Sequence, residues 1–144
     1  MRDGKYDTDF HAWANEQAAL LRSGQLSAAD IENIAEEIES LGKSERRELA
    51  NRLTVLLKHL LKWAHQPKGR GPSWEATIKV QRNGLIRLMR DNPSLKPFLG
   101  PSIDEAHTDA VIEAAQETRL PDAMFPTTCP WSFEQISDPD FWPE

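Results

Sequence analysis

A stripe of apolar residues at helical spacing runs through the middle of this chain and constrains its fold more than any other feature. From Ile31 to Leu41 the apolar positions recur at alternating intervals of three and four, the period of one face of an α-helix, and the stripe resumes after Gly42 from Leu49 to Ala64. The stripe consists of Ile31, Ile34, Ile38, Leu41, Leu49, Leu53, Leu56, Leu57, Leu60, Leu61 and Ala64. Its two halves stay nearly in phase across Gly42 at about 100° per residue. We therefore expect one long helix, with Gly42 as the point where it would bend.

Helix-start and helix-stop signals precede this stripe. Asp7 or Thr8 can cap a first helix, which Gly24 would end. Ser27 and Asp30 then have the spacing of a capping box, with Asp in place of Glu. These signals predict a helix near residues 10–22 and a second start immediately before the stripe.

Proline and glycine divide the second half of the chain. The cluster at residues 66–72 predicts a loop, and Ser73 can cap a helix that ends at residues 92–93, where Asn precedes Pro. A short turn or helix is expected at residues 94–99, and Ser102 would open a last helix reaching Thr118. Because no run alternates with period two, we predict an all-α protein: an antiparallel bundle of four or five helices with one long central helix.

The last segment, residues 121–144, has a different composition, rich in proline and aromatic residues. Its prolines forbid a long helix, yet it is too aromatic for a solvated tail. We expect an extended C-terminal arm packed on the bundle through its aromatic side chains. At 144 residues the whole chain would form a single domain, with helices in residues 1–120 and the arm after them.

Charge is segregated along the chain. Residues 43–96 carry thirteen Lys or Arg against four Asp or Glu, a balance of +9. Residues 1–42 carry three against nine (−6), and residues 97–144 carry one against ten (−9), which sums to the net −6. Either the acidic segments fold against the basic centre, or the centre awaits an anionic partner.

Composition bounds the function further. No apolar run approaches about 18 residues, so we expect no membrane span, and the first residues lack the apolar region of a signal peptide. These features predict a cytoplasmic protein. Cys129 is the single cysteine, so neither an intramolecular disulfide nor a Cys-pair metal site is expected.

One candidate binding surface combines polar, basic and aromatic side chains around the 66–72 loop. A polar row borders the apolar stripe on the long helix, and cations alternate with tryptophans on both sides of the loop, as in proteins that hold single-stranded nucleic acids. The alternative is a hydrogen-bonded network at the edge of the core, with structural tryptophans. The candidate residues are Arg52, His59, Lys62, Trp63, Gln66, Lys68, Arg70, Trp74, Gln81 and Arg82.

Catalytic signatures are missing from the sequence. It contains no H-E-x-x-H, no G-x-S-x-G and no phosphate-binding G-x-x-x-x-G-K motif. His59 and His65 point to sides of the helix about 120° apart, so they cannot chelate one ion together. We therefore predict no cofactor and no metal, and an enzyme using His59 is only a lesser alternative.

Several ordered motifs give the chain a family resemblance. They include residues 36–42 (EEIESLG), 59–63 (HLLKW), 92–95 (NPSL) and the ending from residues 125–126 (FP) through 129–131 (CPW) to 138–141 (DPDF). In these motifs the chain resembles a bacterial family catalogued as domain of unknown function twenty-nine, over residues 6–143. The resemblance implies a small all-helical bacterial protein and carries no established activity, cofactor or catalytic residue.

Two functional hypotheses follow. The first is a non-catalytic module that binds another protein or itself, as a regulator or the neutralising half of a toxin pair, because no catalytic set is present and the arm could dock in a groove. The second is nucleic-acid binding through the basic central helices, where phosphate contacts would make the affinity strongly salt-dependent.

Overall fold

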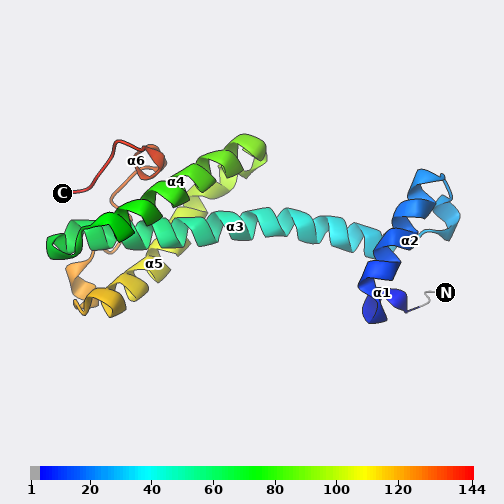
Figure 1. Ribbon diagram of the computed structural model, residues 1–144, viewed down its shortest axis with the longest axis horizontal. Helices are drawn as coiled ribbons and strands as arrows, with labels where there is room; N and C mark the ends of the chain where they lie inside the picture. The colour runs from blue at the N-terminus through cyan, green and yellow to red at the C-terminus, as the bar shows by residue number, and fades with distance from the viewer. Residues whose placement is uncertain (1–3) are drawn as a thin grey trace. The chain divides into compact units, whose positions relative to one another are not determined.

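The computed structural model describes residues 4–144, and all regular secondary structure in that range is helical. This confirms the predicted all-α class and the single long helix. None of these helices combines the length and the apolarity that a bilayer crossing needs. The α-helices are α1 (Lys5–Thr8), α2 (Phe10–Arg22), α3 (Ile31–His65), α4 (Pro72–Asp91), α5 (Leu99–Thr118) and α6 (Phe133–Ser137), and the 3₁₀ helices are η1 (Leu26–Ala28), η2 (Pro67–Gly69), η3 (Pro93–Phe98) and η4 (Asp122–Met124) (Figure 1).

The contacts between residues divide the chain into two compact units. The first ends at Ser44, and the second comprises Glu45–Glu144. Helix α3 contributes residues to both units and remains helical through Gly42, where we had expected any bend. The single-domain organisation of residues 1–144 stays a prediction.

The cap of helix α2 is Asp9, one residue after the later of the two predicted caps. Asp7 and Thr8 belong to the short helix α1, and the side chain of Asp9 accepts a hydrogen bond from the backbone N–H of Ala12 (3.1 Å). Asp9 caps α2 because its backbone leaves the helical region (φ −149°, ψ 77°), which separates the two helices. After α2 the chain turns at Gly24 with φ 77°, as predicted for a helix stop.

The first unit is built around Trp13, which is 4% exposed. The rings of Tyr6 and Phe10 lie 4.7 and 5.4 Å from it, centroid to centroid. Its indole N–H donates to Asp30, whose own backbone N–H donates to the side chain of Gln17 (2.7 Å). These two hydrogen bonds hold Asp30, the residue before α3, against α2.

The expected helix start at Ser27 was wrong. Ser27 lies in the 3₁₀ helix η1, and α3 begins at Ile31. Asp30, the residue before α3, accepts a hydrogen bond from the side chain of Asn33 (2.7 Å). The polar contacts with α2 therefore set the start of α3, and the capping-box spacing does not.

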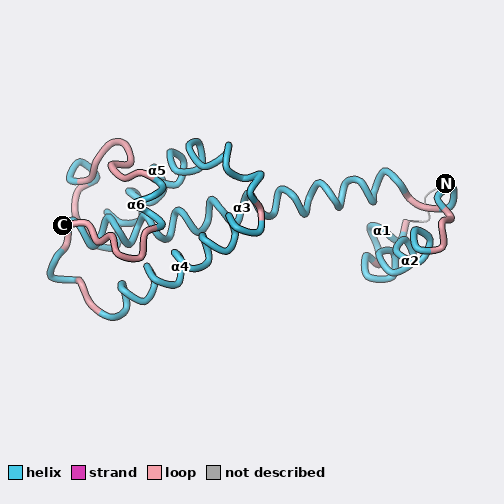
Figure 2. The backbone as a smooth tube through the Cα atoms, turned by 90° about the horizontal axis from the view of Figure 1, so that it is seen from above, coloured by secondary structure: helices cyan, strands magenta, loops and turns pink. Residues whose placement is uncertain are grey.

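In the second unit α4 and α5 flank the C-terminal part of α3 on opposite sides (Figures 1 and 2). Contacts between α3 and α4 pair Arg52 with Gln81, so the two helices are antiparallel across the residue 66–71 loop. Contacts between α3 and α5 pair Lys58 with Glu113, and both helices run in the same direction. The core between the three helices is mostly aliphatic and includes Leu49, Leu53, Leu56, Leu57, Leu60, Leu61, Ile78, Leu85, Leu88, Ala106, Ala110 and Ala114.

The predicted boundaries of α4 and α5 hold to within three residues. Helix α4 starts at Pro72, after Gly71, where we had expected a Ser73 cap, and Asn92 ends it as predicted. Proline is favourable in the first turn because its missing N–H would have no helical partner there. Helix α5 starts at Leu99, three residues before the expected Ser102, because η3 leads directly into it.

The C-terminal arm packs on the bundle as expected. Phe125 and Ile136 are 4% and 0% exposed and belong to the core. The arm also contains α6, a short helix that packs on α4 and begins with a capping box between Ser132 and Gln135. The prolines therefore limit the arm to one short helix between extended stretches.

Candidate functional site

All ten residues of the predicted binding surface lie in the second unit, where most contact one another or the arm. Arg52 donates to Glu48 (Nε to Oε2, 2.8 Å) and to Gln81 (Nη1 to Oε1, 3.2 Å). Its guanidinium also lies against Gly84, where an added Cβ would be 2.2 Å from Nη1. Arg52 and Gln81 therefore link α3 to α4, and the missing side chain of Gly84 leaves room for the Arg52 guanidinium between the two helices.

His59 is held by its own helix. Its Nδ1 lies 2.8 Å from the carbonyl oxygen of Val55, so Nδ1 carries the proton in this bond. Burial lowers the pKa of His59, and the nearby charges of Lys62 and Lys58 act in the same direction. His59 is thus a neutral side chain near pH 7, and no carboxylate of the described residues forms an ion pair with it.

Lys62 is a buried cation, 5% exposed, and joins α3 to α5. Its Nζ donates to Glu117 (2.9 Å) and lies 4.6 Å from the centre of the Trp74 ring. Burial alone would raise the pKa of Glu117, but hydrogen bonds from Lys62 and Lys58 lower it. For Lys58, bonds and charges from Glu117 and Glu113 outweigh burial and raise the pKa. Acidic α5 therefore neutralises part of the basic α3.

The loop residues form a second group. Arg70 donates to the carbonyl oxygen of Trp63 (2.7 Å), and its guanidinium lies 5.4 Å from the Trp63 ring centre. Gln66 makes a long bond of 3.5 Å to the Thr118 carbonyl oxygen. Lys68 is exposed and forms no ion pair within residues 4–144. Trp74 packs so closely on Gly69 that an added Cβ there would lie 2.3 Å from the ring.

Arg82 is 1% exposed and holds the arm. Its Nε donates to the carbonyl oxygen of Ile136 (2.9 Å), and its Nη2 donates to that of Phe141 (2.7 Å). Its Nη1 has no partner in the described chain, and burial lowers the pKa of the guanidinium. Trp142 completes the site, with its ring 5.5 Å from the Arg82 guanidinium and 4.6 Å from the Trp63 ring.

The predicted surface is therefore mainly an internal network. Among its cations, only Lys68 is exposed without a polar partner in the part of the chain described. The described residues also contain no group of three or more His, Cys, Asp or Glu side chains placed to hold a metal ion. The arrangement supplies packing and helix-to-helix bonds, and it presents few donors to a nucleic acid.

Sequence reasoning missed an exposed apolar face at the start of α3. Ile31, Ile38 and Leu41 belong to the stripe that we expected to face inward, yet they are 53, 63 and 69% exposed. Ala35 and Gly42 on the same helix are exposed as well. Asn33, in the same turns of the helix, is buried. The signal that could have revealed this face is the acidic composition around it.

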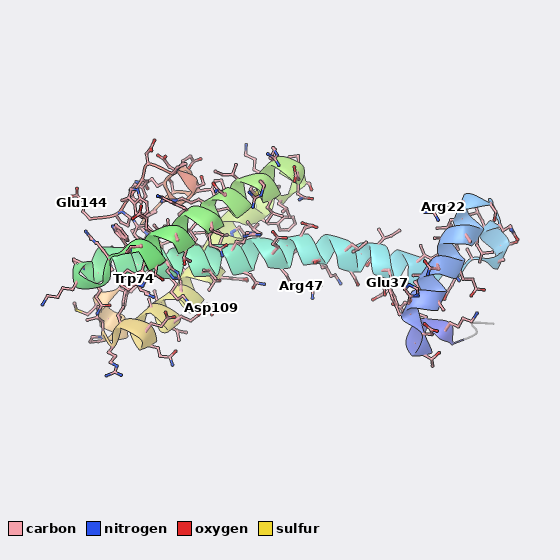
Figure 3. All side chains as sticks on the ribbon, in the orientation of Figure 1. Arg22, Glu37, Arg47, Trp74, Asp109 and Glu144 are labelled. Carbon is pink, nitrogen blue, oxygen red and sulfur yellow. The ribbon has the colours of Figure 1, made fainter. Side chains whose placement is uncertain are left out.

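The charges around this face have one sign. Residues 30–42 contain five acidic side chains and no Lys or Arg. Glu37, labelled in Figure 3, accepts a hydrogen bond from the Tyr6 hydroxyl (2.5 Å), which raises the pKa of Tyr6 to about 12. Glu36 and Glu39 are exposed and form no ion pair with the described residues. The face is thus apolar with a negative border.

Comparison with known proteins identifies the family. The profile of a family described as "Domain of unknown function DUF29" matches residues 5–142. The chain belongs to this DUF29 family. No curated protein and no solved structure matches it. Membership in DUF29 brings no activity with it, so the functional argument depends on the exposed surfaces.

Proposed function

We propose that this chain is a protein-interaction module and that the first three turns of α3 bind an amphipathic helix of a partner protein. The observation that carries the proposal is the exposure of Ile31, Ile38 and Leu41 on one helix. A contiguous apolar face with polar borders is typical of sites where a partner helix docks.

The shape of the face supports a helical partner. At 100° per residue, Ile31, Ala35, Ile38 and Gly42 fall within a sector of about 60°. The isoleucines offer apolar area, while Ala35 between them and Gly42 beyond Ile38 leave room for a second helix to approach closely. The distance between packed helix axes depends on the side chains at the contact, so this alternation favours a close helix-to-helix contact.

Charge selects the kind of partner. With five acidic residues and no basic one in residues 30–42, the face attracts a helix whose borders carry Lys or Arg. A second copy of this chain would bring the same negative charges into the interface, and like charges across an interface are unfavourable. The partner is therefore a different protein, and the helix that binds this face carries Lys or Arg along its borders. The proposal also includes a cytoplasmic setting, consistent with the single free cysteine.

Paired variants test the proposal. Ile38→Glu and Leu41→Glu add charge to exposed positions and should leave the fold intact. Ile112→Glu is the matched control, since Ile112 is 59% exposed on α5 in the other unit. Affinity capture in the presence of nuclease, with a photo-crosslinking residue at exposed position 35 of the same face, should yield a partner crosslinked through an amphipathic, Lys/Arg-rich helix. Both α3 variants should lose this partner, and the control should keep it.

Three results would refute the proposal. One is a partner retained by both Ile38→Glu and Leu41→Glu. Another is concentration-dependent self-association in sedimentation experiments that Ile38→Glu abolishes, which would make the face a homodimer contact. The third is recovery of nucleic acid that depends on Lys68 and disappears at higher salt, which would favour the nucleic-acid hypothesis.

A further inference from the structure

A second surface of interest is a cleft between the last turn of α3 and the C-terminal arm. It has a volume of about 520 Å³ and lies entirely within the Glu45–Glu144 unit. The last turn of α3 forms one wall through His65, and the arm forms the rest through Trp131, Phe141 and Trp142. Glu144, labelled in Figure 3, lies at its rim.

The aromatic walls are held in place by the bundle. Trp131 and Phe141 meet edge to face with their ring centres 6.3 Å apart, and Trp142 packs against Trp63. The carbonyl oxygen of Phe141 accepts the short bond from buried Arg82. Because these contacts fix the rings, the site is preformed, and the protein would lose less conformational entropy when a ligand binds.

The cleft also offers unused hydrogen-bond donors. The indole N–H groups of Trp131 and Trp142 make no hydrogen bond within the described chain. Neither belongs to the buried polar atoms that lack a partner, so both indole nitrogens reach solvent. An indole N–H can only donate, and a ligand that pairs with it must bring an acceptor such as a peptide carbonyl.

We infer that this cleft binds an extended, proline-containing peptide segment of a partner protein, with Lys or Arg beside the prolines. Such segments adopt the polyproline II conformation, which leaves their carbonyl groups free to accept hydrogen bonds. Their rings pack in grooves lined by aromatic side chains, and the conformation is present before binding. Trp131 and Trp142 would each pack a proline ring and donate to a ligand carbonyl.

Charge complementarity specifies the basic residues of the ligand. Residues 120–144 contain five Asp or Glu and no Lys or Arg. Glu134, Asp138, Asp140 and Glu144 are all exposed. Glu144 lines the cleft, and the other three carboxylates belong to the same arm, so the negative charge near the aromatic walls favours a cationic ligand and increases its rate of association. This site is separate from the α3 face, and either proposal can fail without the other.

Peptide selection tests the inference. A phage library of random peptides of about twelve residues is selected on the full-length protein, and the enriched sequences should combine prolines with Lys or Arg. The best peptide is then titrated by calorimetry. Trp131→Phe, which keeps a ring and removes the donor, should weaken binding about three- to tenfold, the effect of one lost hydrogen bond. Trp74→Phe is the matched control, because its indole also makes no hydrogen bond within residues 4–144 but lies outside the cleft.

An NMR titration gives a readout that does not depend on variants. The chain has five tryptophans, and the selected peptide should shift the indole N–H signals of Trp131 and Trp142 and leave the others in place. The inference is overturned by selection of sequences without proline, by equal affinity of wild type and Trp131→Phe, or by indole shifts confined to other tryptophans. Loss of binding on Ile38→Glu would assign the peptide to the α3 face instead.

Discussion

Arg82→Met tests whether a single buried guanidinium holds the C-terminal arm. Methionine fills a similar volume and removes the two short bonds to the carbonyl oxygens of Ile136 and Phe141 (2.9 and 2.7 Å). Hydrogen bonds that involve a charged group contribute about 1.5–3 kcal/mol each, so the two account for about 3–6 kcal/mol. The substitution also removes a buried cation, which offsets part of this loss. We therefore expect the free energy that holds the arm on the bundle to fall by about 3 kcal/mol.

Limited proteolysis measures this loss at the arm itself. The arm contains no Lys or Arg, so chymotrypsin, which cuts after aromatic residues, is the suitable protease. When opening is fast, cleavage follows the population of the open arm, and 3 kcal/mol corresponds to about a hundredfold faster cutting. Arg87→Met is the control, since Arg87 is exposed on the same helix and forms no ion pair with the described residues.

Equal cleavage of Arg82→Met and the wild-type chain would refute this reasoning. The arm would then be held by the burial of Phe125 and Ile136, and the bonds from Arg82 would contribute nothing measurable. Faster cleavage of the Arg87→Met control would refute it as well, because a general loss of helix charge would then explain the effect.

Three further predictions concern groups in both units. Tyr6 is the only tyrosine in the sequence, and its phenolate absorbance should appear near pH 12. Because the folded pKa of Tyr6 lies above the ordinary 10.0, the stability from its hydrogen bond to Glu37 is present below pH 10 and is lost as the pH rises through 12. Glu37→Gln should bring this pKa back towards 10. The lowered pKa of Glu117 contributes stability above its ordinary 4.5 that disappears as the pH falls through the folded value, so Glu117→Gln should flatten the acid side of a urea-unfolding profile against pH. Leu57→Ala, at a fully buried position, should lower the free energy of unfolding by about 2–5 kcal/mol in the same assay. Leu41→Ala, at a position that is 69% exposed, should lower it little. Similar losses for the two variants would contradict the burial of Leu57 and the exposure of Leu41.

Helix positions were predictable where the sequence contains a strong local signal. The 3.6-residue period of the apolar stripe predicts α3, and the Asn-Pro pair at residues 92–93 predicts the end of α4. Cap positions were less predictable, because Asp7, Thr8 and Asp9 are all suitable cap residues. The backbone conformation decides between them, and Asp9 is the one whose backbone leaves the helical region.

Burial was harder to predict because it depends on contacts far away in the sequence. Periodicity shows that Leu41 and Leu49 share a stripe, but it does not show which part of the stripe another helix covers. The charge of Arg82 makes it a candidate nucleic-acid contact in the sequence. Its acceptors lie 54 and 59 residues further along the chain, and no local pattern connects them. Most residues of the predicted binding surface therefore bond to one another, to neighbouring helices or to the arm, and a binding role for this surface stays a prediction.

The dependence of Arg82 on the arm has a consequence for folding during synthesis. Arg82 leaves the ribosome well before its acceptor at Phe141, which is added 59 residues later. At about 5–20 residues per second, this interval lasts roughly 3–12 seconds. During that time the nascent helices expose the hydrophobic surface that Phe125 and Ile136 later cover. The unfinished chain is then a potential client for a ribosome-associated chaperone.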